Sequence, residues 1–230
     1  SMGEVVEDSR HLMVAPACLR PKVLALIDRE IELARAGEEA YLGFKLNGLT
    51  DKLIIDRLIQ ASQAGVKIDL VVRGICCLVG GVPGLTENIT VHSIVGRYLE
   101  HARIYIFGLQ ERKQVYISSA DFMTRNTTRR VEVAVPVNAP ALRAHLEEMF
   151  AAQLRDTAKG RVQQPDGSYV RAQGEPFNAQ EYFCDQARAG VWALERPKAE
   201  PKPAVKPGSA PEKRPAAKGA PKKPAVTVKK

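Results

Sequence analysis

Apolar and polar residues follow two different periods along most of the first 150 residues. Short runs in which apolar residues alternate or cluster predict strands, because successive side chains of a strand point to opposite faces of a sheet. Such runs are His11 to Ala17, Tyr41 to Leu46, Lys67 to Val72, Ile89 to Val95, Arg103 to Phe107, Val115 to Ser118 and Val131 to Val135. The segment Gly108 to Lys113 lies between two of these runs and predicts a hairpin turn.

Three other stretches carry apolar residues at spacings of three and four, which predicts helices that pack by one face. The first opens at Pro21 and ends at Gly37, and the second begins after Thr50 or Asp51 as its cap and stops at Gly65. The third follows Asn138 as its cap, and its apolar face consists of Leu142, His145, Leu146, Met149 and Phe150. Because a strand–helix–strand order implies a parallel pair, we expect an α/β domain with a mixed β-sheet flanked by helices.

The organisation of the chain changes after residue 158, where the periodic signal fades. Turn residues occupy Gln163 to Ser168, and Ala179 to Leu194 has the pattern of an amphipathic helix. We therefore expect an arm at residues 1–10, the folded domain at 11–161, an extension with one helix at 162–195, and a tail at 196–230. Pro, Lys and Ala dominate this tail, which has too little apolar surface to fold and is expected to be disordered.

The formal charge of the whole chain is +8, but it is distributed unevenly. Residues 196–230 contain 11 basic and 2 acidic residues, a net charge of +9, and the remaining 195 residues sum to −1. The basicity is therefore a property of the tail, and it does not by itself indicate a basic binding face on the folded part. We expect the tail to contact a polyanion.

The four cysteines have no metal-ligand spacing, and two of them, Cys76 and Cys77, are adjacent. Free thiols in this pattern favour a reducing compartment, so a cytoplasmic location is expected, with peripheral attachment to a membrane left open. No apolar run is long enough to span a bilayer, and we recognise no signal peptide.

The candidate chemistry concentrates around the predicted hairpin. His101 stands just before one hairpin strand, and Ser118 and Ser119 stand at the end of its partner, so hairpin pairing brings them to one edge of the sheet. The next residues add the anion-binding candidates Arg125, Asn126, Arg129 and Arg130. Such a set suits a phosphate-rich ligand, because the planar fork of arginine matches pairs of phosphate oxygens.

Further candidates close the earlier strands. Arg73 ends one strand, and ligands bind at strand carboxyl ends in open α/β sheets. Lys45 and Asn47 close the preceding strand at what should be the same edge. For each of these residues the competing interpretation is an ordinary solvated strand end, and for His101 it is a buried, hydrogen-bonded histidine. We interpret His11, His92 and His145, which have no comparable neighbours, as structural.

The last two arginines are ambiguous. If Arg129 and Arg130 lie in an extended segment, their side chains point to opposite faces and only one reaches the site. Asp121 and Glu132 are candidates for orienting the arginines of this region, as carboxylates behind a binding site often do.

Several separate motifs together resemble one family. HARIYIFG, VYISSADFMTRN and RRVEV, preceded by FKLNGLTDKLIIDRLIQASQAGVKIDLVVRGICCL, are similar to the last catalytic domain of the bacterial polyphosphate kinases, which belong to the phospholipase D-like superfamily. The superfamily signature is a His-x-Lys pair followed by Gly-Ser-x-Asn. This sequence has Arg103 at the lysine position and Ser-Ser-Ala-Asp at 118–121, departures that are typical of the kinase branch.

The resemblance implies a phospholipase D-like fold and a kinase that reversibly transfers the γ-phosphate of ATP to polyphosphate through a phosphohistidine. That histidine would lie in an earlier domain outside this chain. By the resemblance, His101 matches the second histidine, which contacts the nucleotide phosphates and serves as acid or base, and Arg73 matches a nucleotide-phosphate contact. The implied cofactor is Mg²⁺ bound with ATP, with protein ligands outside this chain. The implied partners are ATP or ADP, polyphosphate, the upstream catalytic half and further copies of the enzyme in a homo-oligomer.

Two alternatives stay open. The chain could be a non-catalytic module that binds ATP, polyphosphate or nucleic acid, with the basic tail as its main contact. It could also be a phosphodiesterase that uses His101 as nucleophile, although Arg103 at the lysine position weakens that interpretation.

Overall fold

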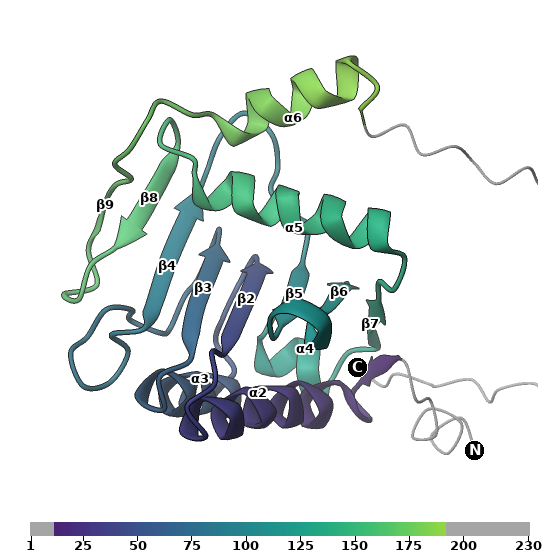
Figure 1. Cartoon of the computed structure of the whole chain (residues 1–230), viewed down its shortest axis with the longest axis vertical. Coiled ribbons are helices and arrows are strands. Elements are labelled where there is room, and N and C mark those ends of the chain that lie inside the picture. Colours follow the sequence, from purple (N-terminus) through teal and green to yellow (C-terminus); the bar gives the residue numbers. More distant parts are fainter. Residues whose placement is uncertain (1–11, 192–230) are drawn as a thin grey trace, which may run out of the picture. The chain divides into compact units, whose positions relative to one another are not determined.

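The computed structural model describes residues 12–191, which build one mixed nine-stranded sheet with helices on both faces (Figure 1). The strands are β1 (Met13–Ala15), β2 (Tyr41–Leu46), β3 (Lys67–Val72), β4 (Ile89–Ile94), β5 (Ile104–Phe107), β6 (Gln114–Ser118), β7 (Glu132–Pro136), β8 (Gly160–Gln163) and β9 (Tyr169–Arg171). The helices are α2 (Leu19–Arg35), α3 (Lys52–Gln63), α4 (Thr124–Thr128), α5 (Pro140–Leu154) and α6 (Ala179–Arg188), with a 3₁₀ turn η1 (Gln110–Arg112). The expected α/β fold class is confirmed.

The strand order is β1-β7-β6-β5-β2-β3-β4-β8-β9. Strands β2, β3 and β4 are parallel, as the strand–helix–strand pattern predicted, and β5 and β6 form the predicted antiparallel hairpin. Strand β5 pairs antiparallel with β2, and β8 pairs antiparallel with β4. The ends of β2, β3, β4 and β6 therefore lie at one edge with the starts of β5 and β8. We call it the carboxyl edge.

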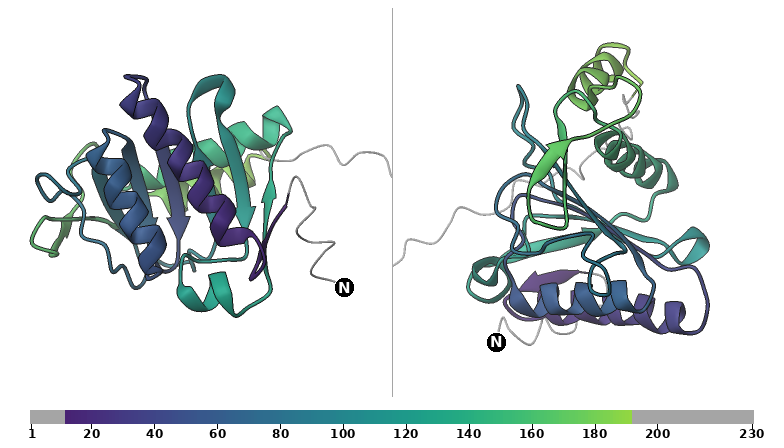
Figure 2. Two further views of the ribbon diagram at one scale, coloured as in Figure 1. Left: turned by 90° about the horizontal axis from the view of Figure 1, so that it is seen from below. Right: turned by 90° about the vertical axis from the view of Figure 1, so that its left-hand side faces the viewer.

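Two helical layers cover the sheet. Helices α2 and α3 lie on one face, and their buried Val23, Ile27 and Leu58 belong to the larger hydrophobic core (Figure 2). Helix α5 lies on the opposite face, where Phe150 joins a second core. Gly43 allows this approach, because a Cβ at its position would lie 3.0 Å from the Phe150 ring.

The helix ends follow the sequence signals in two places. The Asp51 carboxylate accepts hydrogen bonds from the N–H groups of Leu53 and Ile54, so Asp51, and not Thr50, is the cap of α3. Gly37 and Gly65 follow α2 and α3 with φ of +83° and +95°, a conformation that glycine adopts without a steric penalty.

Two predicted helix starts are wrong. Helix α2 begins at Leu19, so Pro21 lies within its first turn, where the missing N–H leaves no hydrogen bond unmade. The cap of α5 is Ala139 and not Asn138, because Pro140 occupies the first helical position. Leu142, predicted on the apolar face of this helix, is 38% exposed.

The structure also contains elements that the sequence patterns did not predict. The segment before β7 forms the short helix α4, and β8 and β9 extend the sheet beyond residue 158. The turn chemistry at residues 163–168 was read correctly, since this segment connects β8 to β9. Helix α6 begins at the predicted Ala179 and has Asn178 as its cap, but it ends at Arg188 and not at Leu194, because Gly190 adopts a φ of +67°.

Some predictions fall outside the described residues. These are the arm at 1–10, His11, the end of the predicted last helix beyond residue 191, and the tail at 196–230. The proposed domain boundaries stay a prediction. All four cysteines are free thiols.

Candidate functional site

The carboxyl edge brings together segments that are far apart in the sequence. Asn47 follows β2, Arg73 follows β3, Arg103 precedes β5 and Ser119 follows β6. The ends of β2 and β3 approach closely because Gly74 comes next: its N–H donates to the carbonyl of Asn47 at 2.9 Å, and a Cβ there would lie only 2.7 Å from that oxygen. The prediction that the strand ends and the hairpin share one edge is confirmed.

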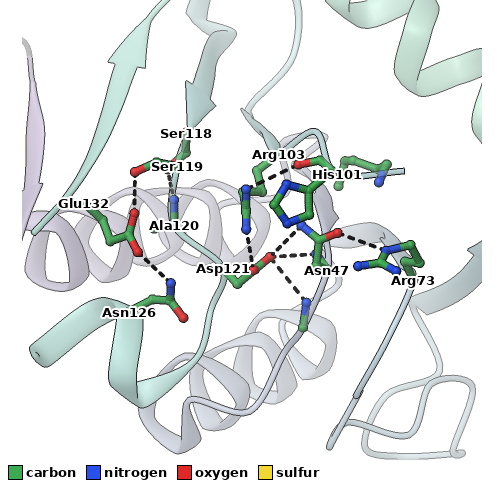
Figure 3. A network of polar contacts seen from close by, with 12 residues as sticks. Asn47, Arg73, His101, Arg103, Ser118, Ser119, Ala120, Asp121, Asn126 and Glu132 are labelled. Atoms are coloured by element: carbon green, nitrogen blue, oxygen red, sulfur yellow. Dashed lines mark hydrogen bonds and ion pairs between the residues drawn. The ribbon is translucent and has the colours of Figure 1, made fainter. Parts of the chain in front are cut away.

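Asp121 is the centre of a hydrogen-bond network at this edge (Figure 3). Its Oδ1 accepts from the backbone N–H of Asn47 at 2.6 Å and of Gly48 at 3.3 Å, and from the Asn47 side-chain amide at 3.4 Å. Its Oδ2 accepts from Nη2 of Arg103 at 2.9 Å. The Asn47 side chain then accepts from Nε of Arg73 at 3.1 Å. The Asp121 carboxylate, which follows β6, thus fixes the end of β2. It holds the guanidinium group of Arg103 directly and that of Arg73 through the Asn47 amide.

The charge of Asp121 is stabilised although its side chain is buried. Burial alone would raise the pKa of Asp121, but the hydrogen bond from Arg103 and those from the backbone N–H groups of Asn47 and Gly48 outweigh it and lower this pKa. Asp121 therefore stays an anion near neutral pH. It orients Arg103, not the arginines at 125–130 for which the sequence suggested it.

His101 presents its imidazole to solvent. Its backbone carbonyl accepts from Nη1 of Arg103 at 3.3 Å, which ties the residue to the Asp121 network, whereas its ring makes no hydrogen bond within residues 12–191. In the view of Figure 3 the ring lies between Arg103 and Asn47. His101 is thus not a buried, hydrogen-bonded histidine, and its ring is accessible to a ligand at this edge.

Lys45 occupies a different position from the other candidates because its side chain is fully buried. Its ammonium donates to the carbonyl of Glu100 at 3.0 Å and lies 3.9 Å from the Glu100 carboxylate. Burial lowers the pKa of Lys45 to about 8, although Glu100 opposes this effect. Lys45 thus supports the residue immediately before His101, and direct contact of Lys45 with phosphate stays a prediction.

A buried glutamine of α6 clamps the segment that leads to His101. The Gln180 amide accepts from the N–H of Tyr98 at 3.0 Å and donates to the carbonyl of Tyr98 at 2.9 Å. The same amide donates to the Glu100 carboxylate at 2.9 Å, which also accepts from Gln153 of α5 at 2.7 Å. Side chains from β2, α5 and α6 therefore fix the backbone just before His101. No periodicity or motif in the sequence indicated these contacts.

Both predicted serine hydroxyls are engaged within the protein. Ser118 accepts from the Tyr105 hydroxyl at 3.0 Å and donates to the carbonyl of Val133 at 3.2 Å. Ser119 donates to Glu132, whose other oxygen accepts from the Asn126 amide at 2.8 Å. Glu132 therefore holds Ser119 and Asn126, and not an arginine. These contacts fix the turn after β6, so any phosphate contact by the two serines or by Asn126 stays a prediction.

Three arginines of this region are exposed: Arg125, Arg129 and Arg130. Within residues 12–191 their side chains form no hydrogen bond or ion pair. Arg129 is the C-terminal cap of α4, and Arg130 follows it outside any strand, so the alternation argument for choosing between them does not apply. Their guanidinium groups are available to an anion.

Comparisons with known proteins agree on one family. Residues 12–181 match the sequence model described as "Polyphosphate kinase C-terminal domain 2". The polyphosphate kinase of Thermosynechococcus vestitus is 47% identical over 173 residues, which are 75% of this chain and 24% of that protein. The polyphosphate kinase of Lactiplantibacillus plantarum is 44% identical over 185 residues, 79% of this chain and 26% of that protein.

A solved structure extends this similarity to the fold. The crystal structure of polyphosphate kinase from Porphyromonas gingivalis is similar with a TM-score of 0.75 and 38% identity, over 80% of this chain and 29% of that one. The chain spans about a quarter of the length of the curated relatives it matches.

Proposed function

The chain belongs to the polyphosphate kinase family, as that family's C-terminal domain 2, and from this premise we propose that it forms one half of a polyphosphate kinase active site. In the proposed reaction the bond between the β- and γ-phosphates of ATP breaks and a nitrogen–phosphorus bond forms on a histidine outside this chain, with ADP leaving. A terminal oxygen of polyphosphate then takes the phosphoryl group from that histidine. Both steps are reversible.

The observation that carries the proposal is the exposed imidazole of His101 beside the Asp121 network. Phosphoryl transfer depends chiefly on positioning and on stabilising the charge of the phosphate oxygens. In our proposal Arg73, oriented by Asn47, pairs with nucleotide phosphates, and His101 binds phosphate as a cation or moves a proton to the leaving oxygen. Asp121 acts indirectly, because it fixes Arg103 and the end of β2.

Magnesium is proposed to arrive with the nucleotide. Residues 12–191 contain no group of three or more His, Cys, Asp or Glu side chains placed to hold a metal ion. The carboxylate of Asp121 is occupied by Arg103 and by backbone N–H groups. The described residues of this half therefore do not fit a protein-held Mg²⁺ site.

The proposed partners follow from the incomplete site. We propose that ATP or ADP and polyphosphate bind between this half and an upstream half of the same enzyme, that the enzyme is a homo-oligomer, and that it works in the cytoplasm. Within the part of the chain that the structure describes, no helix is long and apolar enough to cross a membrane.

The test is transfer from γ-labelled ATP. The chain alone should acquire no stable label, and addition of the upstream half, fused or in trans, should produce labelled polyphosphate. In the assembled enzyme His101→Ala should lower turnover by at least about 100-fold, the usual contribution of a general acid or base. Melting temperatures should show that the variant is folded.

A second variant divides the two functions of His101. His101→Gln keeps a hydrogen-bond donor but cannot exchange a proton near neutral pH. Substantial activity in the Gln variant assigns His101 to phosphate binding, and a loss equal to that of Ala assigns it to proton transfer. A label on His101 of the chain alone that survives alkali and is lost in acid would contradict the proposal, because His101 would then be the phosphorylated residue. Absence of transfer with the upstream half would favour the two alternatives, the binding module and the phosphodiesterase, and release of an alcohol from a phosphodiester would identify the second.

A further inference from the structure

A second group of cations lies at the carboxyl edge, away from the Asp121 network. Lys159, Arg161 and Arg171 line a pocket of about 230 Å³ with Val95, Ala158 and Gly160. All three cationic residues are exposed, and within residues 12–191 none of their side chains forms a hydrogen bond or an ion pair. Half of the lining residues of this small pocket are therefore basic and have no anionic partner.

The pairing of the strands places two of these charges face to face. Arg161 of β8 lies directly opposite Arg171 of β9 in the antiparallel pair. Like charges at directly opposite positions destabilise a pair of strands, because their side chains are neighbours on one face. An anion bound between the two guanidinium groups would remove this repulsion and would use their planar forks.

The buried carboxylate of Asp156 holds the backbone next to these cations in place. The Asp156 carboxylate is fully buried and accepts from the N–H groups of Lys159 at 2.7 Å, Gly160 at 3.0 Å and Ala179 at 2.8 Å. The Asp156 carboxylate thus stabilises the turn before β8 and the start of α6. Gly160 is required in this turn, because a Cβ there would lie 1.9 Å from the carbonyl oxygen of Asp156. The backbone at the start of β8 is therefore fixed.

The pocket opens at the same edge of the sheet as the site at His101. Gly160 pairs with Ile94, the last residue of β4, so the pocket opens at the same edge as Arg73. Strand β8 is two strands from β3, and neighbouring strands are about 4.8 Å apart, which puts the start of β8 about 10 Å from the end of β3. Val95 lines the pocket and begins the segment that leads to His101.

We propose that this pocket binds an oligophosphate, namely an internal part of the polyphosphate chain whose reacting end lies at His101. The proposal rests on the proposed function for the identity of the chain. A linear polymer with one anionic group per unit matches cations that continue along an edge. The pocket has no aromatic side chain on which a base could stack, which disfavours a single-stranded nucleic acid.

The test compares polyphosphate binding by the full chain and by two double variants. Arg161→Ala/Arg171→Ala removes two charges from the pocket, and Arg29→Ala/Arg35→Ala removes two exposed charges from α2 as a matched control. We expect the pocket variant to bind polyphosphate at least about tenfold more weakly. We also expect its affinity to depend less on salt, by about one unit of log–log slope for each lost phosphate contact. The control variant should bind almost as the unchanged chain does.

Competition identifies the source of the oligophosphate. Polyphosphate should protect Arg161 and Arg171 from guanidine-specific modification, and ATP or inorganic phosphate at the same phosphate concentration should not. Equal affinity of the pocket variant and the unchanged chain, an equal loss in the control variant, or preferential protection by ATP would each overturn the proposal.

The melting temperature reports on folding, and phosphoryl transfer in the assembled enzyme reports on catalysis. Removal of the like charges should leave the melting temperature without polyphosphate unchanged or higher, and Arg161→Gln/Arg171→Gln replaces the Ala variant if that one is unstable. In the assembled enzyme, phosphoryl transfer from ATP to a short acceptor should persist in the pocket variant. If the pocket does not bind polyphosphate, the pocket variant should bind polyphosphate and transfer phosphate as the unchanged protein does. If the proposed function is wrong, the unchanged enzyme should transfer no phosphate, and binding of polyphosphate by the pocket can still be measured.

Discussion

Asp121 shows how a single buried carboxylate can arrange groups that never meet in the sequence. It joins the end of β2 to Arg103, and its Asn47 partner passes the constraint on to Arg73. Charged hydrogen bonds of this kind are stronger than neutral ones, and their loss leaves a buried donor without a partner. The positions of the exposed His101 and the half-buried Arg73 therefore depend on a residue that would not touch phosphate.

The buried Lys45 gives a pH-dependent prediction. Its pKa is about 8 in the folded protein and near 10.5 in the unfolded chain, so between these values the unfolded state binds more protons and the free energy of unfolding rises with pH. Lys45→Met lacks this contribution. Relative to the Met variant, the unchanged chain should gain about 3 kcal/mol between pH 8 and 10.5.

Urea unfolding at several pH values measures this difference. Other titrating groups are shared by the two proteins and cancel from it. Lys67→Met, at the exposed start of β3, is the control and should show no such pH dependence. A Lys45→Met difference that does not vary with pH would show that Lys45 is charged in the folded state throughout this range.

Individual site residues were predictable only where their chemistry was local. His101 stands out because it comes just before the first apolar run of the hairpin, and the two serines and the arginines at 125–130 because they come after the second. The buried partners were not recognisable, because Glu100 meets Lys45, Gln153 and Gln180 through contacts that span up to 80 residues. A buried amide has no periodic pattern. Its significance depends on which backbone groups the fold leaves without partners.

Helix α6 is structurally part of the site although it is remote in sequence, which leads to a stability prediction. Gln180→Leu keeps the volume of the side chain but removes three hydrogen bonds, to the N–H and carbonyl of Tyr98 and to Glu100. Buried polar groups left without partners each cost about 1–3 kcal/mol. The variant should therefore lose at least about 2 kcal/mol of unfolding free energy in a denaturant titration. Gln186→Leu on the same helix should lose almost nothing, and equal stability of the two variants would contradict the clamp.

The accuracy of the predicted elements depended on their length and on the residues that mark their ends. Strands β2 and β3 were predicted to the residue, because four of the six residues in each are large and apolar and each strand is next to a helix with clear end signals. Helix α4 has only five residues, TRNTT, which do not favour a helix. It is held instead by contacts such as the hydrogen bond from the Thr127 hydroxyl to Asp51 at 2.6 Å. Strand β8 has four residues beginning with glycine and exists because β4 offers an edge to pair with.

Exposed basic side chains gather at the carboxyl edge of the sheet. His101 and the arginines at 125, 129 and 130 are exposed there without side-chain partners in residues 12–191, and the pocket of Lys159, Arg161 and Arg171 lies at the same edge. The net charge of residues 1–195 is nevertheless −1. In our proposal, polyanion binding by the folded part therefore depends on where its cations stand and not on its total charge.

The basic segment at 196–230 gives a prediction for the whole chain, because it carries +9 while the rest carries −1. Its composition predicts that it does not contribute to the folded core, so deletion should leave the melting temperature unchanged. Polyphosphate affinity should fall and its salt dependence should become shallower, because each lost cation–phosphate contact releases one counterion fewer. A full-length variant with glutamine at the 11 basic positions is the control for chain length and should behave like the deletion. A large loss of thermal stability would contradict the first expectation, and an unchanged salt slope would contradict the second. A residual salt slope that becomes shallower still when Arg161→Ala/Arg171→Ala is combined with the deletion would separate tail binding from binding at the carboxyl edge.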